Sequence, residues 1–144
     1  MKRLLILAAL LLPFGAIADN HRSWEPGTYW TVTSVDTKPG KFDAYISDLK
    51  NNWRRAMEAQ KANGKVKTYM MFSNVNARAD EGDLYLLVEW NSAADMLDTP
   101  PDYFEGVVAD VFGSLDDADK ANIDRGELRT IMSTSLLRSL SFAD

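Results

Sequence analysis

Three tyrosines and one tryptophan are the residues of this sequence whose types and spacing favour a small-molecule site. Tyr29, Tyr69 and Tyr85 lie in stretches that alternate with aliphatic residues, and Trp53 lies in the apolar stripe of a helical segment. Phenols beside an indole suit an apolar or aromatic ligand, and phenols facing a cavity could hold or deprotonate an aromatic substrate. The alternative for each is a structural role, because tyrosine is favoured in strands and tryptophan in cores.

Two polar residues could complete such a site. Asn74 and Arg78 follow the second predicted strand, where they would present polar groups at a cavity mouth or else form a solvated loop. Arg54 and Glu58, which are four residues apart on a predicted helix, have the spacing of a surface ion pair.

The composition excludes several other kinds of chemistry. The chain has 144 residues, of which 46% are apolar and 26% charged, as is typical of one globular domain. The absence of cysteine excludes disulfides, thiol catalysis and cysteine-based metal sites, and His21 is the only histidine. A net charge of −5 argues against a nucleic-acid partner. No hydrolase, zinc-protease or nucleotide-binding motif is present.

The acidic side chains concentrate in residues 80–127, which contain 14 acidic and two basic residues. Asp116 and Glu127 have the spacing of positions 1 and 12 of an EF-hand loop. Positions 3, 5 and 6, which require oxygen ligands and glycine, fall on Ala118, Lys120 and Ala121. A loop that starts at Asp117 also lacks the required residues. We therefore predict a solvated acidic surface and no metal site, with a looser, weak cation site as the alternative.

The N-terminal segment has the three parts of a secretory signal peptide. Two basic residues precede nine apolar residues at positions 4–12, and small residues stand at positions 16 and 18. Cleavage is expected between Ala18 and Asp19. The 15 residues of 4–18 are too few to span a bilayer, which takes about 20. We therefore predict export to a bacterial periplasm or to the cell exterior, without a stable membrane anchor after processing.

The elements that must position the candidate side chains alternate between strand and helix. After the signal segment 1–18 and an arm 19–27, residues 28–144 are expected to form the domain. Its strands are predicted over 28–35, 66–75, 83–90 and 128–142, and the last of these is expected to bend near 133–135. Its helices are predicted over 41–63 and 102–112, with a short helix that begins at Ser92. Residues 114–125 are expected to form a short helical or irregular insert. The order β-α-β-β-α-β predicts a ferredoxin-like α+β fold with an antiparallel sheet.

Both faces of the predicted sheet carry large apolar side chains. In the third strand, one face is predicted to carry Leu84, Leu86, Val88 and Trp90, and the other face Tyr85 and Leu87. In the second strand, one face is predicted to carry Val66, Met70 and Phe72, and the other face Tyr69, Met71 and Val75. Helices on one face would leave the other face bare, which is costly for an apolar surface. We therefore predict a homodimer in which a second copy covers the bare face.

Three stretches of the chain resemble the dimeric α/β-barrel superfamily, which includes antibiotic-biosynthesis-monooxygenase-like and NIPSNAP-like domains. They are TYWTVTSVDTKPGKFDAYISDLKNNW, ANGKVKTYMMF and GDLYLLVEWNSAADM, and the resemblance, one of pattern and spacing, covers roughly residues 28–142. It implies a ferredoxin-like protomer, pairing of two sheets, and a ligand cavity between the sheet and its own helices. Haem-binding members use an axial histidine, but His21 lies outside these stretches, so no cofactor is expected.

The sequence therefore predicts an exported domain that binds a small apolar or aromatic molecule. The expected cavity residues are Tyr29, Trp53, Tyr69, Asn74, Arg78 and Tyr85. A cofactor-free monooxygenase- or isomerase-like enzyme and a non-catalytic structural or interaction module are the alternatives, and no motif decides whether the protein is an enzyme.

Overall fold

The computed structural model describes residues 22–143. The predicted signal segment, its cleavage site at Ala18 and Asp19, and His21 lie outside the described residues. The elements, in chain order, are β1 (Trp24–Thr37), α1 (Phe42–Asp48), the π-helical turn η1 (Leu49–Trp53), α2 (Arg54–Ala62), β2 (Val66–Ser73), β3 (Leu84–Trp90), α3 (Ala93–Leu97), α4 (Pro101–Phe112), α5 (Leu115–Gly126) and β4 (Arg129–Phe142).

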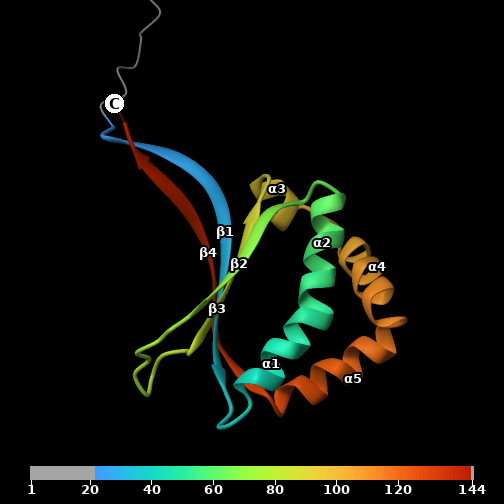
Figure 1. Ribbon diagram of the computed structural model, residues 1–144. Coiled ribbons are helices and arrows are strands. Elements are labelled where there is room, and N and C mark those ends of the chain that lie inside the picture. Colours follow the sequence, from blue (N-terminus) through green and yellow to red (C-terminus); the bar gives the residue numbers. More distant parts are fainter. Residues whose placement is uncertain (1–21, 144) are drawn as a thin grey trace, which may run out of the picture.

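The four strands form one antiparallel sheet with the order β2-β3-β1-β4. The long helices form a second layer on one side of this sheet (Figure 1). A β-α-β-β-α-β chain with this strand order and a single helical layer has the ferredoxin-like α+β fold, so the predicted fold class is confirmed.

The core lies between the sheet and the helical layer. Alternate residues of β3, from Leu84 to Trp90, point toward the helices and are buried. They belong to two apolar clusters, one built around Leu84 and Leu49 and the other around Trp90 and Met57. Trp53 packs against both clusters. This one side chain therefore joins the two halves of the core.

A β-bulge changes which residues of β2 face the core. The register with β3 shifts between Val66 and Thr68, so Lys67 is an extra residue in the strand. One extra residue reverses the alternation of the side chains. Val66 is therefore buried under the helices, whereas Met70 and Phe72 face the other way. The prediction that these three residues share a face is wrong for this reason.

The first strand begins earlier than expected, at Trp24, inside the predicted arm 19–27. Trp24 lies opposite Phe142, so β4 provides hydrogen-bonding partners up to the start of β1. Pro26 and Gly27 suggest a turn in the sequence, but here they precede a register shift within the strand. Figure 1 shows the outer ends of β1 and β4 extending together beyond the helical layer.

The acidic segment predicted as a short helical or irregular insert forms a complete helix, α5, of 12 residues. Ser114 caps its N-terminus, because the Ser114 hydroxyl accepts a hydrogen bond of 3.0 Å from the backbone N–H of Asp117. Arg125 near its C-terminus donates to Asp48 of α1 over 2.6 Å. The segment therefore belongs to the helical layer, and its acidic residues lie on a helix rather than in a metal-binding loop.

Candidate functional site

Trp53 and Tyr69 are the two predicted cavity residues that the fold brings together. Trp53 ends the π-helical turn η1, and Tyr69 lies on the helix-covered face of β2. Their rings meet edge to face, with centroids 5.1 Å apart and planes at 85°. This is a favoured geometry for an aromatic pair, and it fixes both rings at the edge of the core.

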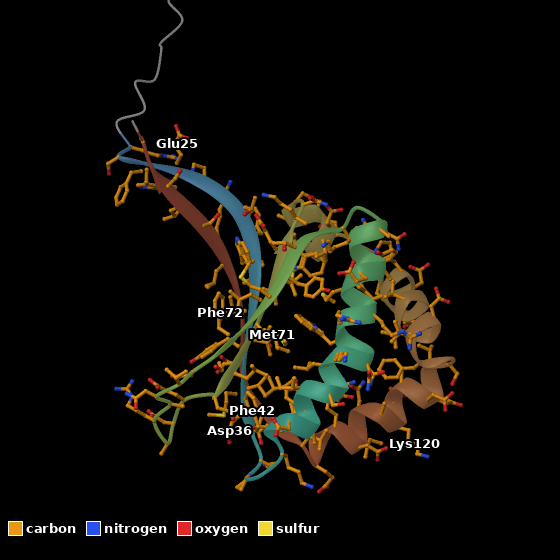
Figure 2. The ribbon with its side chains drawn as sticks, viewed as in Figure 1. Glu25, Asp36, Phe42, Met71, Phe72 and Lys120 are labelled. Atoms are coloured by element: carbon orange, nitrogen blue, oxygen red, sulfur yellow. The ribbon has the colours of Figure 1, made fainter. Side chains whose placement is uncertain are left out.

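The pair lines a pocket of about 240 Å³ between β2 and the first helical segment, which we call the Trp53–Tyr69 pocket. β2 is an edge strand, and the helices do not reach fully over it, so Met71 remains 43% exposed on the face that they cover. Figure 2 shows Met71 between the sheet and the helices and Phe72 on the far side of the sheet. The complete lining is Ile46, Leu49, Lys50, Trp53, Arg54, Tyr69 and Met71.

The π-helical turn explains how one helix presents these residues to the pocket. Residues 46, 49, 50, 53 and 54 follow helical spacing, so they occupy one face of α1, η1 and α2. A π-helical turn widens the helix locally and is frequent at functional sites. In this chain it carries Leu49, Lys50 and Trp53 together toward the pocket.

The Tyr69 hydroxyl donates a hydrogen bond of 2.5 Å to Oε1 of Glu58 on α2. Burial raises the pKa of Tyr69, and the hydrogen bond to the Glu58 carboxylate raises it further, to about 12. The phenol is therefore protonated at neutral pH. Its one O–H is donated to Glu58, so the phenol oxygen can only accept a hydrogen bond from a ligand, and it is a poor general base.

The expected ion pair between Arg54 and Glu58 does not form in the structure. Glu58 accepts from Tyr69 instead, and within residues 22–143 no carboxylate lies at ion-pairing distance from Arg54. The helical spacing is correct, but β2 brings a phenol to Glu58 that the spacing could not reveal. Arg54 is therefore left beside the pocket without an ion-pair partner in the described chain.

The two other tyrosines lie elsewhere. Tyr29 is on the helix-covered face of β1, where Arg138 lies over its ring at 4.9 Å, and it does not line the Trp53–Tyr69 pocket. Tyr85 lies opposite Ser34 in β1, on the face of the sheet away from the helices. The three phenols therefore do not form a single cluster, because alternation along β3 puts Tyr85 on the opposite face.

Asn74 and Arg78 belong to the loop between β2 and β3, where both bind Glu81. The Arg78 side chain donates to Glu81 Oε1 over 3.0 Å, and Asn74 Nδ2 donates to Glu81 Oε2 over 3.4 Å. Hydrogen bonds from the backbone and side chain of Arg78 lower the pKa of Glu81. These contacts shape the loop, and neither residue lines the Trp53–Tyr69 pocket.

Sequence reasoning missed five members of the pocket lining as binding residues. Ile46 and Leu49 stood in the predicted helical stripe, and Met71 was assigned to the same strand face as Tyr69. These three residues are of types found in protein cores, and they line a pocket only because the fold brings them together at the partly uncovered edge of the sheet. Lys50 and Arg54 had a detectable signal, because they are four residues apart beside Trp53 on the helix.

The face of the sheet away from the helices, which we call the open face, is the other notable surface. Register places large apolar side chains there from all four strands: Trp30, Val32, Met70, Phe72, Tyr85, Leu87 and Leu137. Residues 22–143 provide no second layer over them (Figure 1). Phe72 is 54% exposed and Leu137 50% exposed, so the open face offers a large apolar surface.

A buried carboxylate lies on the same open face. Glu89 is only 7% exposed and accepts hydrogen bonds from the Thr28 hydroxyl, at 2.6 Å, and from Lys67 Nζ, at 3.0 Å. Burial alone would raise the pKa of Glu89, but these two donors outweigh burial and lower it. The bulge at Lys67 therefore supplies the cation that keeps this carboxylate charged.

Two other classes of site were sought in the described chain. Within residues 22–143, no group of three or more His, Asp or Glu side chains is placed to hold a metal ion. None of the helices in this part of the chain is long and apolar enough to cross a membrane.

Comparison with known proteins adds three solved structures. A dimeric ferredoxin-like protein from an uncultured marine organism has a TM-score of 0.49 and 8% identity, over 83% of this chain and 91% of that one. A Pseudomonas aeruginosa protein has a TM-score of 0.46 and 12% identity, over 81% and 96% of the two chains. A dimeric Bacteroides fragilis protein of unknown function with a ferredoxin-like fold has a TM-score of 0.39 and 12% identity, over 81% and 97%. No protein-family model matches the chain, and no curated protein sequence matches it.

Proposed function

We propose that this protein binds a small apolar or aromatic molecule in the Trp53–Tyr69 pocket. The observation that carries the proposal is the edge-to-face pair of Trp53 and Tyr69, which walls a pocket that the helices leave open at the edge strand β2. Ligand pockets are typically apolar hollows with a few polar groups that orient the ligand, and Tyr69 provides such a group. The volume of about 240 Å³ lies below the roughly 300–1,000 Å³ typical of pockets for drug-sized ligands, which favours a small ligand.

Binding rather than catalysis is the activity that the geometry favours. A cofactor-free monooxygenase- or isomerase-like reaction that begins with proton abstraction needs a base beside the substrate. Tyr69, with its pKa of about 12, keeps its proton and donates it to Glu58, so neither of these two groups is free to act as that base.

A pair of neighbouring residues tests the binding proposal. Met71 and Phe72 are adjacent in β2 and similarly exposed, at 43% and 54%, but they point to opposite faces (Figure 2). N-phenyl-1-naphthylamine, a neutral aromatic probe, should become fluorescent in the wild-type protein. We expect Met71→Glu to abolish this signal. Phe72→Glu changes the open face, so it should retain the signal even where it weakens the proposed dimer, and circular dichroism should show that both variants fold. A wild-type protein that does not bind the probe or any other small aromatic compound would contradict the proposal.

We also propose that the protein is a homodimer, of the kind formed by dimeric α/β-barrel proteins, in which two open faces pack together. The support is the apolar surface contributed by all four strands and the lack of a covering layer in the part of the chain that the structure describes. A specific interface buries about 800 Å² per partner, an area that one four-stranded sheet face can supply. Sedimentation equilibrium tests this assembly directly.

We propose, finally, that the protein is exported to the periplasm or the cell exterior after cleavage between Ala18 and Asp19. The support is the order of charged, apolar and small residues in positions 1–18. Mass spectrometry of the protein from its native host should find Asp19 at the N-terminus. An intact chain beginning at Met1 in the cytoplasm would contradict export.

A further inference from the structure

The Trp53–Tyr69 pocket adjoins a second, more polar hollow. This outer hollow has a volume of about 540 Å³ and is lined by Arg54, Arg55, Glu58 and Tyr69. Arg54 and Tyr69 line both hollows, so the two hollows lie side by side and we treat them as one site with two ends. One end of the site is apolar and aromatic, and the other end is charged.

Cations dominate the charged end. Lys50 and Arg54 lie one helical turn apart at the rim of the apolar pocket, and Arg55 lines the outer hollow. Within residues 22–143, no carboxylate lies at ion-pairing distance from any of these three side chains. Lys61 adds a fourth positive charge, with its Nζ 5.6 Å from the centre of the Tyr69 ring. The positive potential at this rim is therefore not neutralised by contacts within the described chain.

The one carboxylate at this end is already engaged. Glu58 accepts the Tyr69 hydroxyl at 2.5 Å, and this bond turns the carboxylate toward the phenol. A local excess of cations stands out because the protein as a whole carries a net charge of −5. A positive rim on an acidic protein attracts small anions to that place on the surface.

We propose that the ligand is an apolar organic anion, whose ring or hydrocarbon body fills the Trp53–Tyr69 pocket and whose carboxylate-type group binds Arg54 and Lys50. The inference deepens the proposed function and rests on it. The guanidinium of Arg54 offers paired donors that match a carboxylate or sulfonate, and Lys50 adds a point charge. Tyr69 lines both hollows, and because its one O–H is donated to Glu58, the head group is held by Arg54 and Lys50 rather than by the phenol.

Two isosteric probes test the charge requirement. The compounds 2-naphthoate and 2-naphthamide have the same ring body, but only naphthoate is anionic at pH 7.5. Isothermal titration of the full mature chain should show naphthoate binding roughly ten- to a hundred-fold more tightly than naphthamide, the gain expected for a charge-assisted hydrogen bond. The preference should decrease as the salt concentration rises.

Two matched variants locate the charge. Arg54→Gln removes an exposed cation from the site and should reduce the preference for naphthoate to about two-fold or less. Lys120→Gln removes an exposed cation from α5, away from the pocket (Figure 2), and should leave the preference unchanged.

The outcomes separate this inference from the proposed function. Equal binding of the two probes would overturn the anion inference and leave apolar binding in place. A preference for naphthoate that survives Arg54→Gln would also overturn it, because another group would then hold the carboxylate. Failure of both probes to bind would contradict the pocket proposal itself.

Discussion

The two faces of the sheet contain similar residues, but one face is buried beneath the helices and the other is exposed. On the covered face, Leu84 is buried beneath the helices, whereas Leu87, three residues later, lies on the open face. Both faces carry large apolar side chains, so hydrophobicity alone does not distinguish them. The faces differ because all the long helices of the described residues lie on one side of the sheet (Figure 1). Apolar surface therefore has a structural role on one face and is available for association on the other.

The covered face is itself not uniformly covered. Its centre, at Leu84 and Val35, is packed, but the helices leave the edge strand β2 partly exposed at Met71. The pocket lies at this boundary, where core-type side chains meet solvent and cations. A binding site here requires no special motif, because it needs only a helical layer narrower than the sheet.

The largest expected effect is a difference in stability between substitutions at Leu84 and at Leu87. Leu84→Ala should lower the free energy of unfolding by about 2–5 kcal/mol, because it leaves a cavity in a packed core. Leu87→Ala should have a smaller effect that decreases with dilution, since in the proposed dimer its stabilising contacts come from a second copy. Urea unfolding at two protein concentrations measures both. A concentration-independent loss of similar size for both variants would contradict the distinction between the faces.

The next effect concerns the assembly itself. Leu87→Lys places a charge in the middle of the open face, and it should weaken a dimer by about 3 kcal/mol, giving monomer or aggregate. Val75→Lys is the control, because Val75 is 95% exposed in the β2–β3 loop. Sedimentation equilibrium should show a dimer for wild type and Val75→Lys only. A wild-type chain that is monomeric at tens of micromolar would show that the open face is not the dimer interface.

A buried charge on the open face predicts a response to acid. The pKa of Glu89 in the folded protein lies below its ordinary value of 4.5, so its stabilising effect is complete above that pH. The effect is lost as the pH falls through the lower, folded pKa. Glu89→Gln should reduce stability at pH 7 by about 1.5–3 kcal/mol, the usual value of a hydrogen bond to a charged group.

Thermal melts from pH 7 to pH 3 measure this dependence. The Glu89→Gln variant should lose less stability than wild type on acidification, and the two should converge at the acid end. Parallel melting curves over the whole range would show that Glu89 has an ordinary pKa in the folded protein.

The smallest expected effect is the loss of stability when Tyr69, on the covered face, loses its hydrogen bond, and it depends on alkaline pH. Tyr69→Phe removes the hydrogen bond to Glu58 and should lower stability by about 0.5–1.5 kcal/mol. Because the pKa of Tyr69 is raised from 10 to about 12, this contribution is present below pH 10 and is lost as the pH rises through 12. The difference in phenolate absorbance between wild type and variant gives the titration of Tyr69. A midpoint near 10 would contradict the assignment.

Much of the fold could be read from local pattern. The helical spacing over 41–63, the alternation along β3 and the Ser92 cap are each encoded within a few residues, and each appears in the structure. Ser92 accepts the backbone N–H of Asp95 at 3.1 Å, as its position suggests. Elements that depend on distant pairing were harder to place. The start of β1 at Trp24 is set by its partner Phe142, far away in the sequence.

The candidate site shows the same limit. Trp53 and Tyr69 could be named from residue type, but their pairing depends on the way α1, η1 and α2 cross the edge of the sheet. Tyr85 could not be separated from them without the strand register. The bulge at Lys67 reversed the face of Val66, and no local signal in the sequence marks that extra residue.

By itself, the amino-acid sequence determined the order of elements, the apolar stripes and the acidic character of the second half, because these depend on residue type and short-range periodicity. The tertiary structure alone decided that Glu58 accepts from Tyr69 rather than pairing with Arg54, and that Met71 lines a pocket while Phe72 faces away. The physical reason is that a side chain's environment is set by strands and helices far from it in sequence. Local propensity determines which helices and strands form, and their packing determines which side chains come into contact.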